Sequence, residues 1–181
     1  MELYKGRPKT NEGRLEREIR VYDFLDEHGI EYMRTDHAPV DTMEACYEID
    51  SILQAVICKN LFLCNRQKTQ FYLLMMPGDK AFKTKEITSQ IGSARLSFAS
   101  AEDMEKYLDI KPGAVSIMGL MNDTENKVQL LVDEDVLDGE YLGCHPCVST
   151  SSLRIRTDQL FGKYLEAVHH DMIKVRLTGE E

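Results

Sequence analysis

The sequence predicts a single domain, residues 1–181, with a mixed α/β fold: a mainly antiparallel β-sheet with helices packed around it. Three observations lead to this prediction. The length of 181 residues is that of one domain. A composition of 43% hydrophobic and 29% charged residues is enough to build a core. Segments with strand character outnumber helical ones and do not alternate strictly with them, which disfavours a doubly wound parallel sheet.

The N-terminal part predicts a helix, a short strand and the start of a second helix. Residues 12–28 have apolar side chains at helical spacing, and Gly29 stands where a C-terminal cap is expected. The apolar positions are Leu15, Ile19, Tyr22 and Leu25. Residues 30–35 are typical of a strand. The order Asp41-Thr42-Met43-Glu44 has capping-box spacing and predicts that a helix begins there.

The central part predicts a β-hairpin followed by alternating short elements. Residues 54–64 and 71–76 are nearly continuous apolar runs separated by six polar residues, which indicates two strands buried on both faces. Pro77-Gly78 then marks a turn. We expect a helix over 83–91 that stops at Gly92, a strand over 95–99, and a helix that Ser100 caps and that runs through Leu108.

The C-terminal part predicts mainly strands. Residues 115–120 and 128–132 read as two strands, separated by the turn-like Asn122-Asp123. A strand pair is expected over 141–143 and 152–156, then a helix over 159–168 and a closing strand over 172–177. His169 and His170, between the last two elements, are expected on the surface.

Charge and hydropathy limit the possible partners. The net charge of −9 argues against tight, sequence-independent binding of nucleic acid, so no DNA partner is expected, although a local basic patch could contact one RNA end. Two candidate patches are Lys5, Arg7, Lys9, Arg14 and Arg17, and Lys80, Lys83 and Lys85; for each alone, a solvated charged face is the better interpretation. No apolar stretch approaches ~20 residues, and residues 1–10 are charged and lack an apolar h-region. We therefore expect no signal peptide, no membrane contact and a cytoplasmic location.

The five cysteines are expected to be reduced thiols, because they are odd in number and no secretion signal accompanies them. Cys144 and Cys147 form a C-x-x-C pattern that raises a redox alternative. It lies late in the chain, and residues 148–156 do not have helical character, unlike the segment after a thioredoxin-type motif. No second C-x-x-C completes a zinc site, so no metal or cofactor is expected.

Lys59 and Asn60 interrupt an otherwise apolar run, residues 55–63. A lysine inside a buried strand is costly unless it has a partner or lines a cavity. On a regular strand the two side chains point to opposite faces, so both serve one site only if a bulge or a strand end intervenes. The alternative is an edge-strand lysine whose ammonium group reaches solvent.

His145 is the histidine best placed for chemistry. It lies between Gly143 and Pro146 in an expected loop, and the following proline holds its backbone extended, which frees the ring to project into a cleft. A structural role is nevertheless the more frequent one for a lone histidine. His37, before Ala38-Pro39, is a weaker candidate.

Several sequence blocks together carry a family resemblance. They are residues 35–44, 57–63, 95–99, 111–116, 119–123 and 145–150. In this order, over about residues 15–177, they resemble the YbaK/prolyl-tRNA synthetase-associated editing superfamily. The branch that the chain most resembles is that of the free-standing alanyl-tRNA(Pro) deacylases, called ProX or PrdX.

The resemblance implies a mixed α/β editing-domain fold and hydrolysis, in trans, of the ester in mischarged tRNA. The partners it implies are the 3′ end of tRNA(Pro) and prolyl-tRNA synthetase, with no cofactor and no metal. The implied catalytic residues are Lys59, Asn60 and His145, with backbone N–H groups around residues 143–147 as an oxyanion hole. The implied substrate-binding residues are Thr35, His37, Met118, Gly143, Cys144, Pro146, Cys147 and Ser149.

The chain departs from the family pattern near the expected pocket. Ile117 and Met118 stand where Pro-Phe is frequent, Cys147 where a larger apolar residue is usual, and Ser149 where asparagine is common. These departures leave the amino acid that is cleared open. Two other function classes also stay open: a non-catalytic sensor of aminoacyl-tRNA or amino acid, and a thiol oxidoreductase that uses the C-x-x-C pattern.

Overall fold

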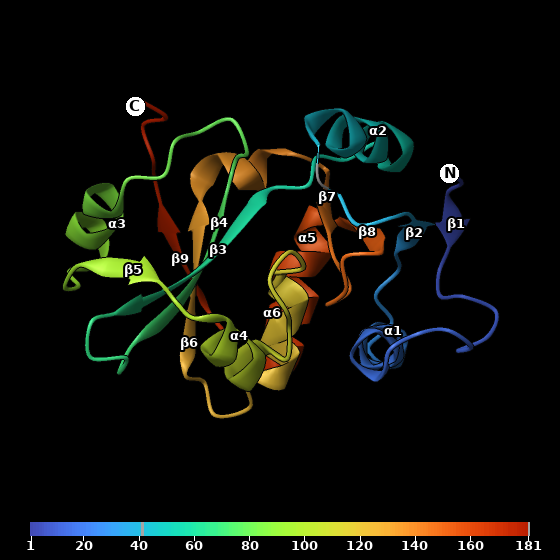
Figure 1. Ribbon diagram of the computed structural model, residues 1–181, viewed down its shortest axis with the longest axis horizontal. Coiled ribbons are helices and arrows are strands. Elements are labelled where there is room, and N and C mark those ends of the chain that lie inside the picture. The colour runs from blue at the N-terminus through green and yellow to red at the C-terminus, as the bar shows by residue number, and fades with distance from the viewer. Residues whose placement is uncertain (41, 181) are drawn as a thin grey trace.

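The computed structural model describes residues 1–40 and 42–180, which form two β-sheets with helices around them (Figure 1). The four-stranded sheet has the order β1 (Tyr4–Lys5), β2 (Met33–Asp36), β8 (Ser151–Arg156), β7 (Tyr141–Cys144). The five-stranded sheet has the order β5 (Leu96–Phe98), β3 (Lys59–Asn65), β4 (Phe71–Met76), β6 (Val128–Asp133), β9 (Met172–Val175). The predicted mixed α/β class is therefore confirmed, but the one expected sheet is divided into two.

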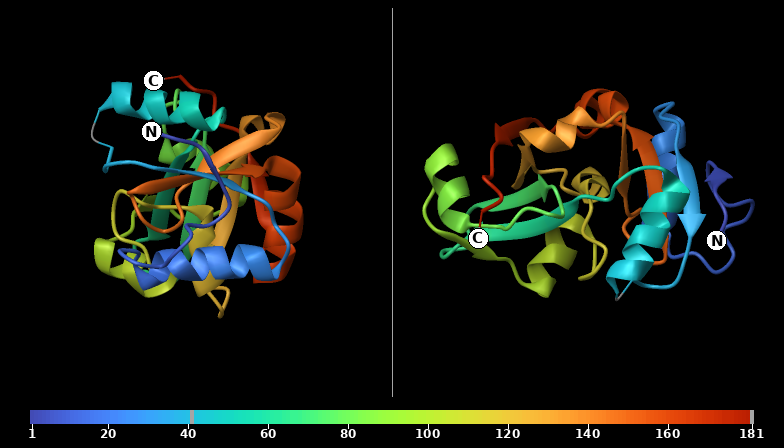
Figure 2. Two further views of the ribbon diagram at one scale, coloured as in Figure 1. Left: turned by 90° about the vertical axis from the view of Figure 1, so that its right-hand side faces the viewer. Right: turned by 90° about the horizontal axis from the view of Figure 1, so that it is seen from above.

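The helices cover both sheets. They are α1 (Glu16–Glu27), α2 (Met43–Leu53), α3 (Thr84–Ile91), α4 (Ala101–Leu108), the 3-10 helices η1 (Ile117–Asn122) and η2 (Glu134–Asp138), and a continuous helical stretch of α5 (Thr157–Gln159), the π-helical η3 (Leu160–Tyr164) and α6 (Leu165–Val168). Helices α1 and α2 lie on opposite sides of the four-stranded sheet (Figure 2). No helix of the described residues is long and apolar enough to cross a membrane.

The β3–β4 hairpin lies at the centre of the five-stranded sheet and is buried on both faces, as its continuous apolar runs predict. Alternate residues Phe71, Leu73 and Met75 enter the main core, between this sheet and the rest of the molecule. Leu74 and Met76 enter a second core on the other face, under α3. The pairs β4–β6 and β6–β9 are parallel, and the other strand pairs are antiparallel, so the sheets are mainly antiparallel as expected.

The strand predicted at residues 115–120 is wrong, because this segment forms the 3-10 helix η1. The hydroxyl of Ser116 accepts a hydrogen bond from the Met118 N–H at 3.1 Å and so starts the helical turn. Gly119 then packs closely against the end of α4, where an added Cβ would lie 2.9 Å from Leu108 Cβ and 2.8 Å from Ile110 Cδ1. The apolar run is thus a tightly packed turn in the core.

The first helix is shorter than predicted, and its buried face is confirmed at Tyr22 and Leu25 but not at Leu15. Leu15 is only its N-cap and is 60% exposed, whereas Glu18, Val21, Tyr22 and Leu25 are the buried positions. A buried carboxylate is tolerated at Glu18 because Arg14 and the Tyr22 hydroxyl donate hydrogen bonds to it. Further along, the expected capping box at 41–44 is partly confirmed: Thr42 caps α2 by accepting from the Ala45 N–H at 3.2 Å, and Asp41 lies outside the described residues.

His170 is buried, which corrects its predicted surface position, while His169 is exposed. The Nε2 atom of His170 lies 2.9 Å from Asp123 Oδ2. Asp123 also accepts hydrogen bonds from the N–H groups of Lys127 and Val128 and thereby shapes the turn before β6. Burial lowers the pKa of His170, but the hydrogen bond with Asp123 outweighs burial, and the net pKa is raised above 6.5.

We predict that His170→Gln destabilises the protein more at pH 5.5 than at pH 8. A histidine whose folded-state pKa is raised stabilises the fold fully below its unfolded pKa of about 6.5, and this contribution is lost as the pH rises through the folded pKa. Glutamine keeps a hydrogen bond but not the charge. We therefore expect the free energy of unfolding of the variant to be about 1 kcal/mol below that of the wild type at pH 5.5. Urea unfolding at both pH values measures it.

The exposed neighbour provides the control: His169→Gln should change the unfolding free energy equally, and little, at both pH values. If His170→Gln lowers the free energy of unfolding by the same amount at pH 5.5 and at pH 8, His170 does not stabilise the fold through its charge.

Candidate active site

An isolated parallel β-bridge links Ile57, two residues before β3, to Gly143 of β7 and so connects the two sheets. The Gly143 N–H donates to the Val56 carbonyl at 3.2 Å. The two backbone segments approach so closely that a Cβ at Gly143 would lie 2.7 Å from Ile57 Cγ1. Only glycine, which has no Cβ, avoids this overlap. Lys59 and His145 each follow the bridge by two residues. Because the two segments run in the same direction, both residues lie on the same side of it. The bridge therefore brings the start of β3 beside the end of β7.

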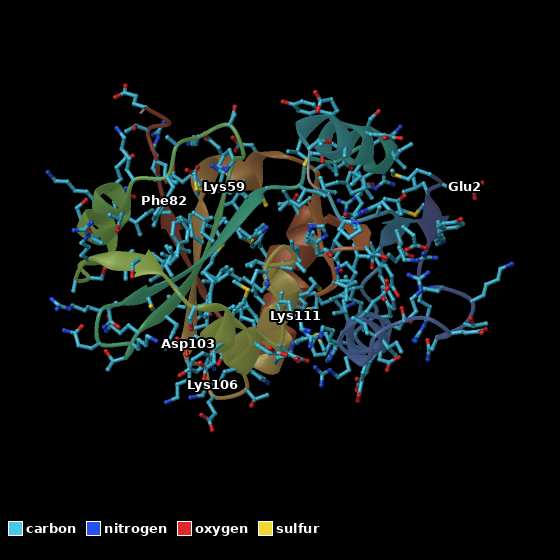
Figure 3. The ribbon with its side chains drawn as sticks, viewed as in Figure 1. Glu2, Lys59, Phe82, Asp103, Lys106 and Lys111 are labelled. Carbon is cyan, nitrogen blue, oxygen red and sulfur yellow. The ribbon has the colours of Figure 1, made fainter. Side chains whose placement is uncertain are left out.

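Lys59 is the first residue of β3, so the strand end required for a shared site with Asn60 is present. The observed strand is shorter than the predicted one, residues 54–64, because α2 extends to Leu53 and ends at Gln54, which has a left-handed conformation. Lys59 is half-buried, and its Nζ donates to the Lys80 carbonyl at 3.0 Å. It lies at the end of the sheet near the loop that follows β4 (Figure 3). One carbonyl leaves other ammonium hydrogens free for a ligand.

The Lys80 carbonyl is itself fixed by the Lys80 side chain. Its ammonium group contacts both oxygens of the fully buried Asp133 at 3.2 and 3.1 Å, and Asp135 at 2.9 Å. It also donates to the Leu177 carbonyl at 2.8 Å, beyond β9. Lys80 is therefore an interior anchor rather than part of a solvated charged face, which corrects that interpretation for this residue.

Asn60 has one side-chain atom that is satisfied and one that is not. Its Nδ2 donates to the Cys58 carbonyl at 3.0 Å, which orients the amide. Its Oδ1 is buried and has no hydrogen-bond partner among the described residues. A buried acceptor without a partner is costly in a folded protein, and a ligand donor or a water would satisfy it. Asn60 therefore offers an oriented acceptor beside Lys59.

One nitrogen of the His145 ring is held, and the other has no hydrogen-bond partner among the residues that the structure describes. Nδ1 lies 2.9 Å from the Ser151 carbonyl. A carbonyl only accepts hydrogen bonds, so Nδ1 carries the proton and Nε2 of the neutral ring is an acceptor. Burial, together with the nearby His37 ring, lowers the pKa of His145 below 6.5, and the ring is neutral at pH 7. The ring centroids of His37 and His145 are 6.2 Å apart.

His37 and Thr35 approach the same loop from β2. His37 Nε2 lies 2.8 Å from the Ser152 hydroxyl, and Nδ1 lies 2.8 Å from the Ala38 carbonyl. Thr35 is fully buried, pairs with Ser152, and has a hydroxyl without a partner among the described residues. The structure thus brings His37 to His145, while Thr35 lies beneath the surface of the sheet.

The loop after His145 supplies backbone donors. Over the described part of the chain, no residue accepts a hydrogen bond from the N–H groups of Cys147, Val148 and Ser149. Cys147 has a positive φ of 63°, which turns the chain at this point. The Gly143 N–H, by contrast, is already bound to Val56. The N–H groups that remain for an oxyanion therefore lie after His145 and not at Gly143.

A cleft of about 470 Å³ adjoins this loop. Its walls come from α1, from the segment after α4 and from residues 147–150; they comprise Leu15, Glu16, Arg17, Arg20, Asp109, Lys111, Pro112, Ala114, Cys147, Val148, Ser149 and Thr150. The lining includes the expected binding residues Cys147 and Ser149 but none of the three expected catalytic side chains. The cleft lies next to the candidate site and does not contain its chemistry.

The remaining expected pocket residues are interior. Cys144 and Cys147 are each 1% exposed, and Met118 and Pro146 are also buried. All five cysteines are free thiols. Burial raises the pKa of Cys144 and of Cys147 to about 12, so neither is a thiolate at neutral pH. This disfavours the thiol oxidoreductase alternative.

Four residues that support the site were not predicted: Arg14, Asp36, Lys80 and Ser151. In the sequence, Arg14 and Lys80 stand out only as members of the two candidate basic patches. The one available signal was that Ser151 follows the His145 loop in a segment rich in serine and threonine. Their roles depend on partners distant in sequence, such as Arg14 and Ser151, which are separated by 137 positions.

Comparison with known proteins identifies the family. A family model described as the aminoacyl-tRNA editing domain matches residues 37–162, which include Lys59, Asn60 and His145. The chain belongs to the aminoacyl-tRNA editing domain family. The predicted family is confirmed, and with it the predicted class of activity, an aminoacyl-tRNA-editing hydrolase.

Individual relatives agree with this assignment. The editing domain is 34% identical, over 136 residues, to the prolyl-tRNA editing protein ProX of Acetoanaerobium sticklandii, a match that covers 75% of this chain and 83% of ProX. It is 27% identical to the prolyl-tRNA synthetase associated domain-containing protein 1 of Danio rerio, over 82% of this chain and 80% of the relative. A crystal structure of a candidate trans-editing enzyme for prolyl-tRNA synthetase has the same fold, with a TM-score of 0.64, 15% identity, and coverage of 90% of this chain and 98% of that one.

We predict that Gly143→Ala destabilises the editing domain by ~1–3 kcal/mol, because the added methyl group overlaps Ile57 at the bridge. Ile57→Ala in the same chain removes the overlapping Cγ1 and should recover part of the loss. Chemical denaturation of the two single variants and the double variant gives the coupling energy.

Gly162→Ala is the matched control, since an added Cβ there meets nothing within 4 Å. It should leave stability unchanged or slightly raised, as expected for alanine in a helix. Additive effects of Gly143→Ala and Ile57→Ala would mean that the two sheets are not held together by close contact at this bridge.

Proposed function

We propose that this editing domain hydrolyses alanyl-tRNA(Pro) in trans, by cleaving the ester between alanine and the terminal ribose. The observation that carries the proposal is the arrangement of Lys59 and Asn60 beside the His145 loop, across the Ile57–Gly143 bridge, in a chain of this family. We take residues 1–181 as one catalytic unit, acting in the cytoplasm, where tRNA is charged.

Each group has a role that its surroundings support. The Lys59 ammonium group, with hydrogens left free by Lys80, is suited to the terminal phosphate or ribose, or to polarising the ester. The buried Asn60 Oδ1 accepts from the attacking water or from the substrate amino group. Nε2 of His145 accepts a proton from the water or from a ribose hydroxyl at neutral pH. The N–H groups of residues 147–149 stabilise the oxyanion.

The amino acid preference follows from the logic of editing. A synthetase pocket cannot strongly exclude a smaller amino acid, because a missing methylene is worth only ~1–3 kcal/mol. A second pocket that admits alanine and rejects the proline ring by overlap completes a double sieve. Cys147 and Met118 stand where the family pattern differs. Cys147 forms part of the cleft wall and bears directly on pocket size, whereas Met118 is fully buried and does not line the cleft.

The partners follow from the same proposal. The editing domain acts on mischarged tRNA, and we propose tRNA(Pro) and prolyl-tRNA synthetase because the relatives carry names linked to them. With a net charge of −9, contact with RNA is expected to be brief and limited to the aminoacyl end.

We predict that alanyl-tRNA(Pro) is deacylated faster than seryl-, cysteinyl- or prolyl-tRNA(Pro), with prolyl-tRNA(Pro) spared. Alanine fits a pocket built for a methyl group, and overpacking such a site with a pyrrolidine ring costs ~1–3 kcal/mol or more. Side-by-side rates of release of each labelled amino acid, corrected for spontaneous hydrolysis, measure the preference.

The outcomes separate three possibilities. Rapid release of proline would defeat the editing role, and a preference for serine or cysteine would defeat only the alanine assignment. A protein that binds these tRNAs without turnover would be the non-catalytic sensor.

We predict that Lys59→Ala lowers kcat/KM on the preferred substrate at least 100-fold, equivalent to ~2.7 kcal/mol, with little change in melting temperature. Lys59 is the first residue of β3, and its side chain makes one hydrogen bond, to the Lys80 carbonyl. Removing that side chain therefore removes a ligand contact and leaves the core intact. Lys85→Ala, at an exposed position of α3, is the control and should retain full activity. Wild-type turnover by a folded Lys59→Ala protein would exclude the role.

A further inference from the structure

His145 can act as proposed only if its ring keeps one tautomer. Nε2 accepts a proton only when Nδ1 holds the hydrogen, and that choice is made by the Ser151 carbonyl at 2.9 Å. Rotation of this carbonyl would leave the other tautomer free to form. The position of Ser151, the first residue of β8, is therefore as important as that of the histidine itself.

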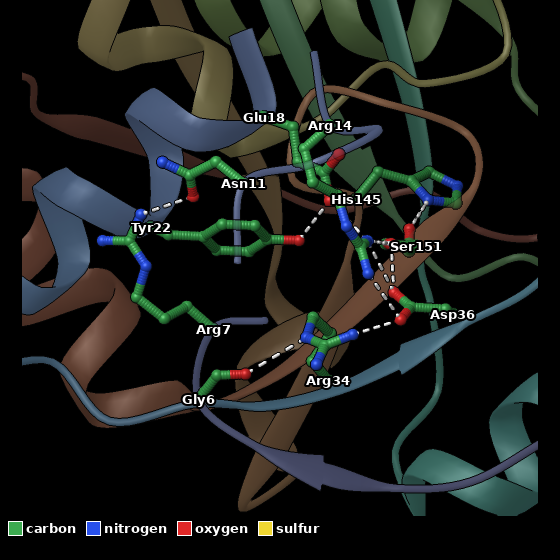
Figure 4. Close-up of polar contacts among 10 residues, drawn as sticks. All are labelled: Gly6, Arg7, Asn11, Arg14, Glu18, Tyr22, Arg34, Asp36, His145 and Ser151. Carbon is green, nitrogen blue, oxygen red and sulfur yellow. Dashed lines mark hydrogen bonds and ion pairs between the residues drawn. The ribbon is translucent and has the colours of Figure 1, made fainter. Parts of the chain in front are cut away.

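Ser151 is held through its hydroxyl. Its Oγ donates to Asp36 Oδ1 at 2.6 Å and accepts from Arg14 Nη1 at 3.3 Å (Figure 4). Asp36, at the end of β2, is the register partner of Ser151 and lies directly opposite it. The same residue thus presents its carbonyl to His145 and its hydroxyl to a carboxylate.

Arg14 holds Asp36 with two parallel hydrogen bonds, Nη1 to Oδ1 at 3.0 Å and Nη2 to Oδ2 at 2.9 Å. Such a fork fixes both distance and orientation. Arg34 donates to Asp36 from the other side and also to the Gly6 carbonyl. Burial raises the pKa of Asp36, but the hydrogen bonds from Arg14, Arg34 and Ser151 hold it well below its usual range, so the carboxylate stays charged.

The Arg14 end of this network is half-buried and extends to a buried carboxylate. Arg14 is 21% exposed, and its Nη1 also donates to Glu18 at 3.0 Å, a residue whose side chain is 3% exposed. Glu18 in turn accepts from the Tyr22 hydroxyl of α1 at 2.5 Å. A set of two carboxylates and two guanidinium groups with so many mutual hydrogen bonds is rigid, because moving one member leaves another charge unpaired.

We propose that Arg14 and Asp36 are positioning residues for His145: through the hydroxyl of Ser151 they hold the carbonyl that keeps the imidazole in its Nδ1–H form. Both residues precede the segment, 37–162, that matches the family model. The N-terminal segment, from Gly6 to Arg14, therefore completes a site whose reacting groups lie elsewhere in the chain. The inference rests on the proposed function, in which Nε2 of His145 accepts a proton.

The test combines a tautomer measurement with kinetics. Long-range ¹⁵N–¹H correlation spectra of the ligand-free protein distinguish the two neutral tautomers of each histidine, and His145→Gln assigns the relevant signal. In the wild type we expect only the Nδ1–H form. In Arg14→Ala and in Ser151→Ala we expect the Nε2–H form to appear, with kcat on the preferred aminoacyl-tRNA at least tenfold lower and KM within about twofold. Arg14→Lys, which keeps the charge without the fork, should lie between.

The controls make the result decisive. Arg156→Ala removes another arginine ion pair, with Asp158, at the far end of β8, and should change neither the tautomer nor kcat. Ser151→Ala deletes only a hydroxyl, so it tests the link even if Arg14→Ala does not fold. A folded Ser151→Ala protein with the wild-type tautomer and wild-type kcat would overturn the inference. Absence of turnover by the wild type would instead defeat the proposed function, and the tautomer spectra would still decide the positioning of His145.

Discussion

The close approach of Ile57 and Gly143 is the contact on which the rest of the site depends. It is the parallel bridge between the two sheets, and it exists only because no side chain separates the backbones at Gly143. Beyond the bridge the two segments belong to different sheets: one segment carries Lys59 and the other carries His145. A site that needs groups from both sheets is therefore set by one backbone contact rather than by a continuous strand ladder.

Beyond the bridge, the two functional side chains are held in the same way. Lys59 and His145 each donate to a backbone carbonyl, of Lys80 and of Ser151 respectively. In both cases the residue that owns the carbonyl is tied by its own side chain to a buried or half-buried aspartate, Asp133 or Asp36. Burying those charges costs desolvation energy that the ion pairs only partly offset, so such pairs are better explained by geometry than by stability. The protein thus fixes mobile side chains through main-chain groups, which have fewer degrees of freedom.

Local sequence pattern was sufficient for much of this architecture and insufficient for its long-range contacts. The β3–β4 hairpin, the Ser100 cap and the segments around Lys59 and His145 follow from neighbouring residues, and the structure contains them where expected. The 3-10 helix at Ile117 and the buried His170 were missed because tight packing at Gly119 and a partner at Asp123 override local preference. For the same reason, local sequence indicates surface charges at Arg14 and Lys80, although each binds an aspartate in the structure. Charge alone does not reveal which basic side chain forms an ion pair with a carboxylate that is distant in the sequence.

The anchor of Lys80 has a consequence for the order of events during synthesis. Its ammonium group binds the carbonyl of Leu177, close to the C-terminal end of the described chain, while Lys59 leaves the ribosome long before that residue is made. The parallel strand β9, which leads to Leu177, joins the edge of its sheet last in the chain order, and such non-local pairing forms slowly. A nascent polypeptide therefore has its β3–β4 hairpin in place while Lys80 still lacks its contact with Leu177. We therefore expect the carbonyl that holds Lys59 to take its final position only after β9 has joined the sheet.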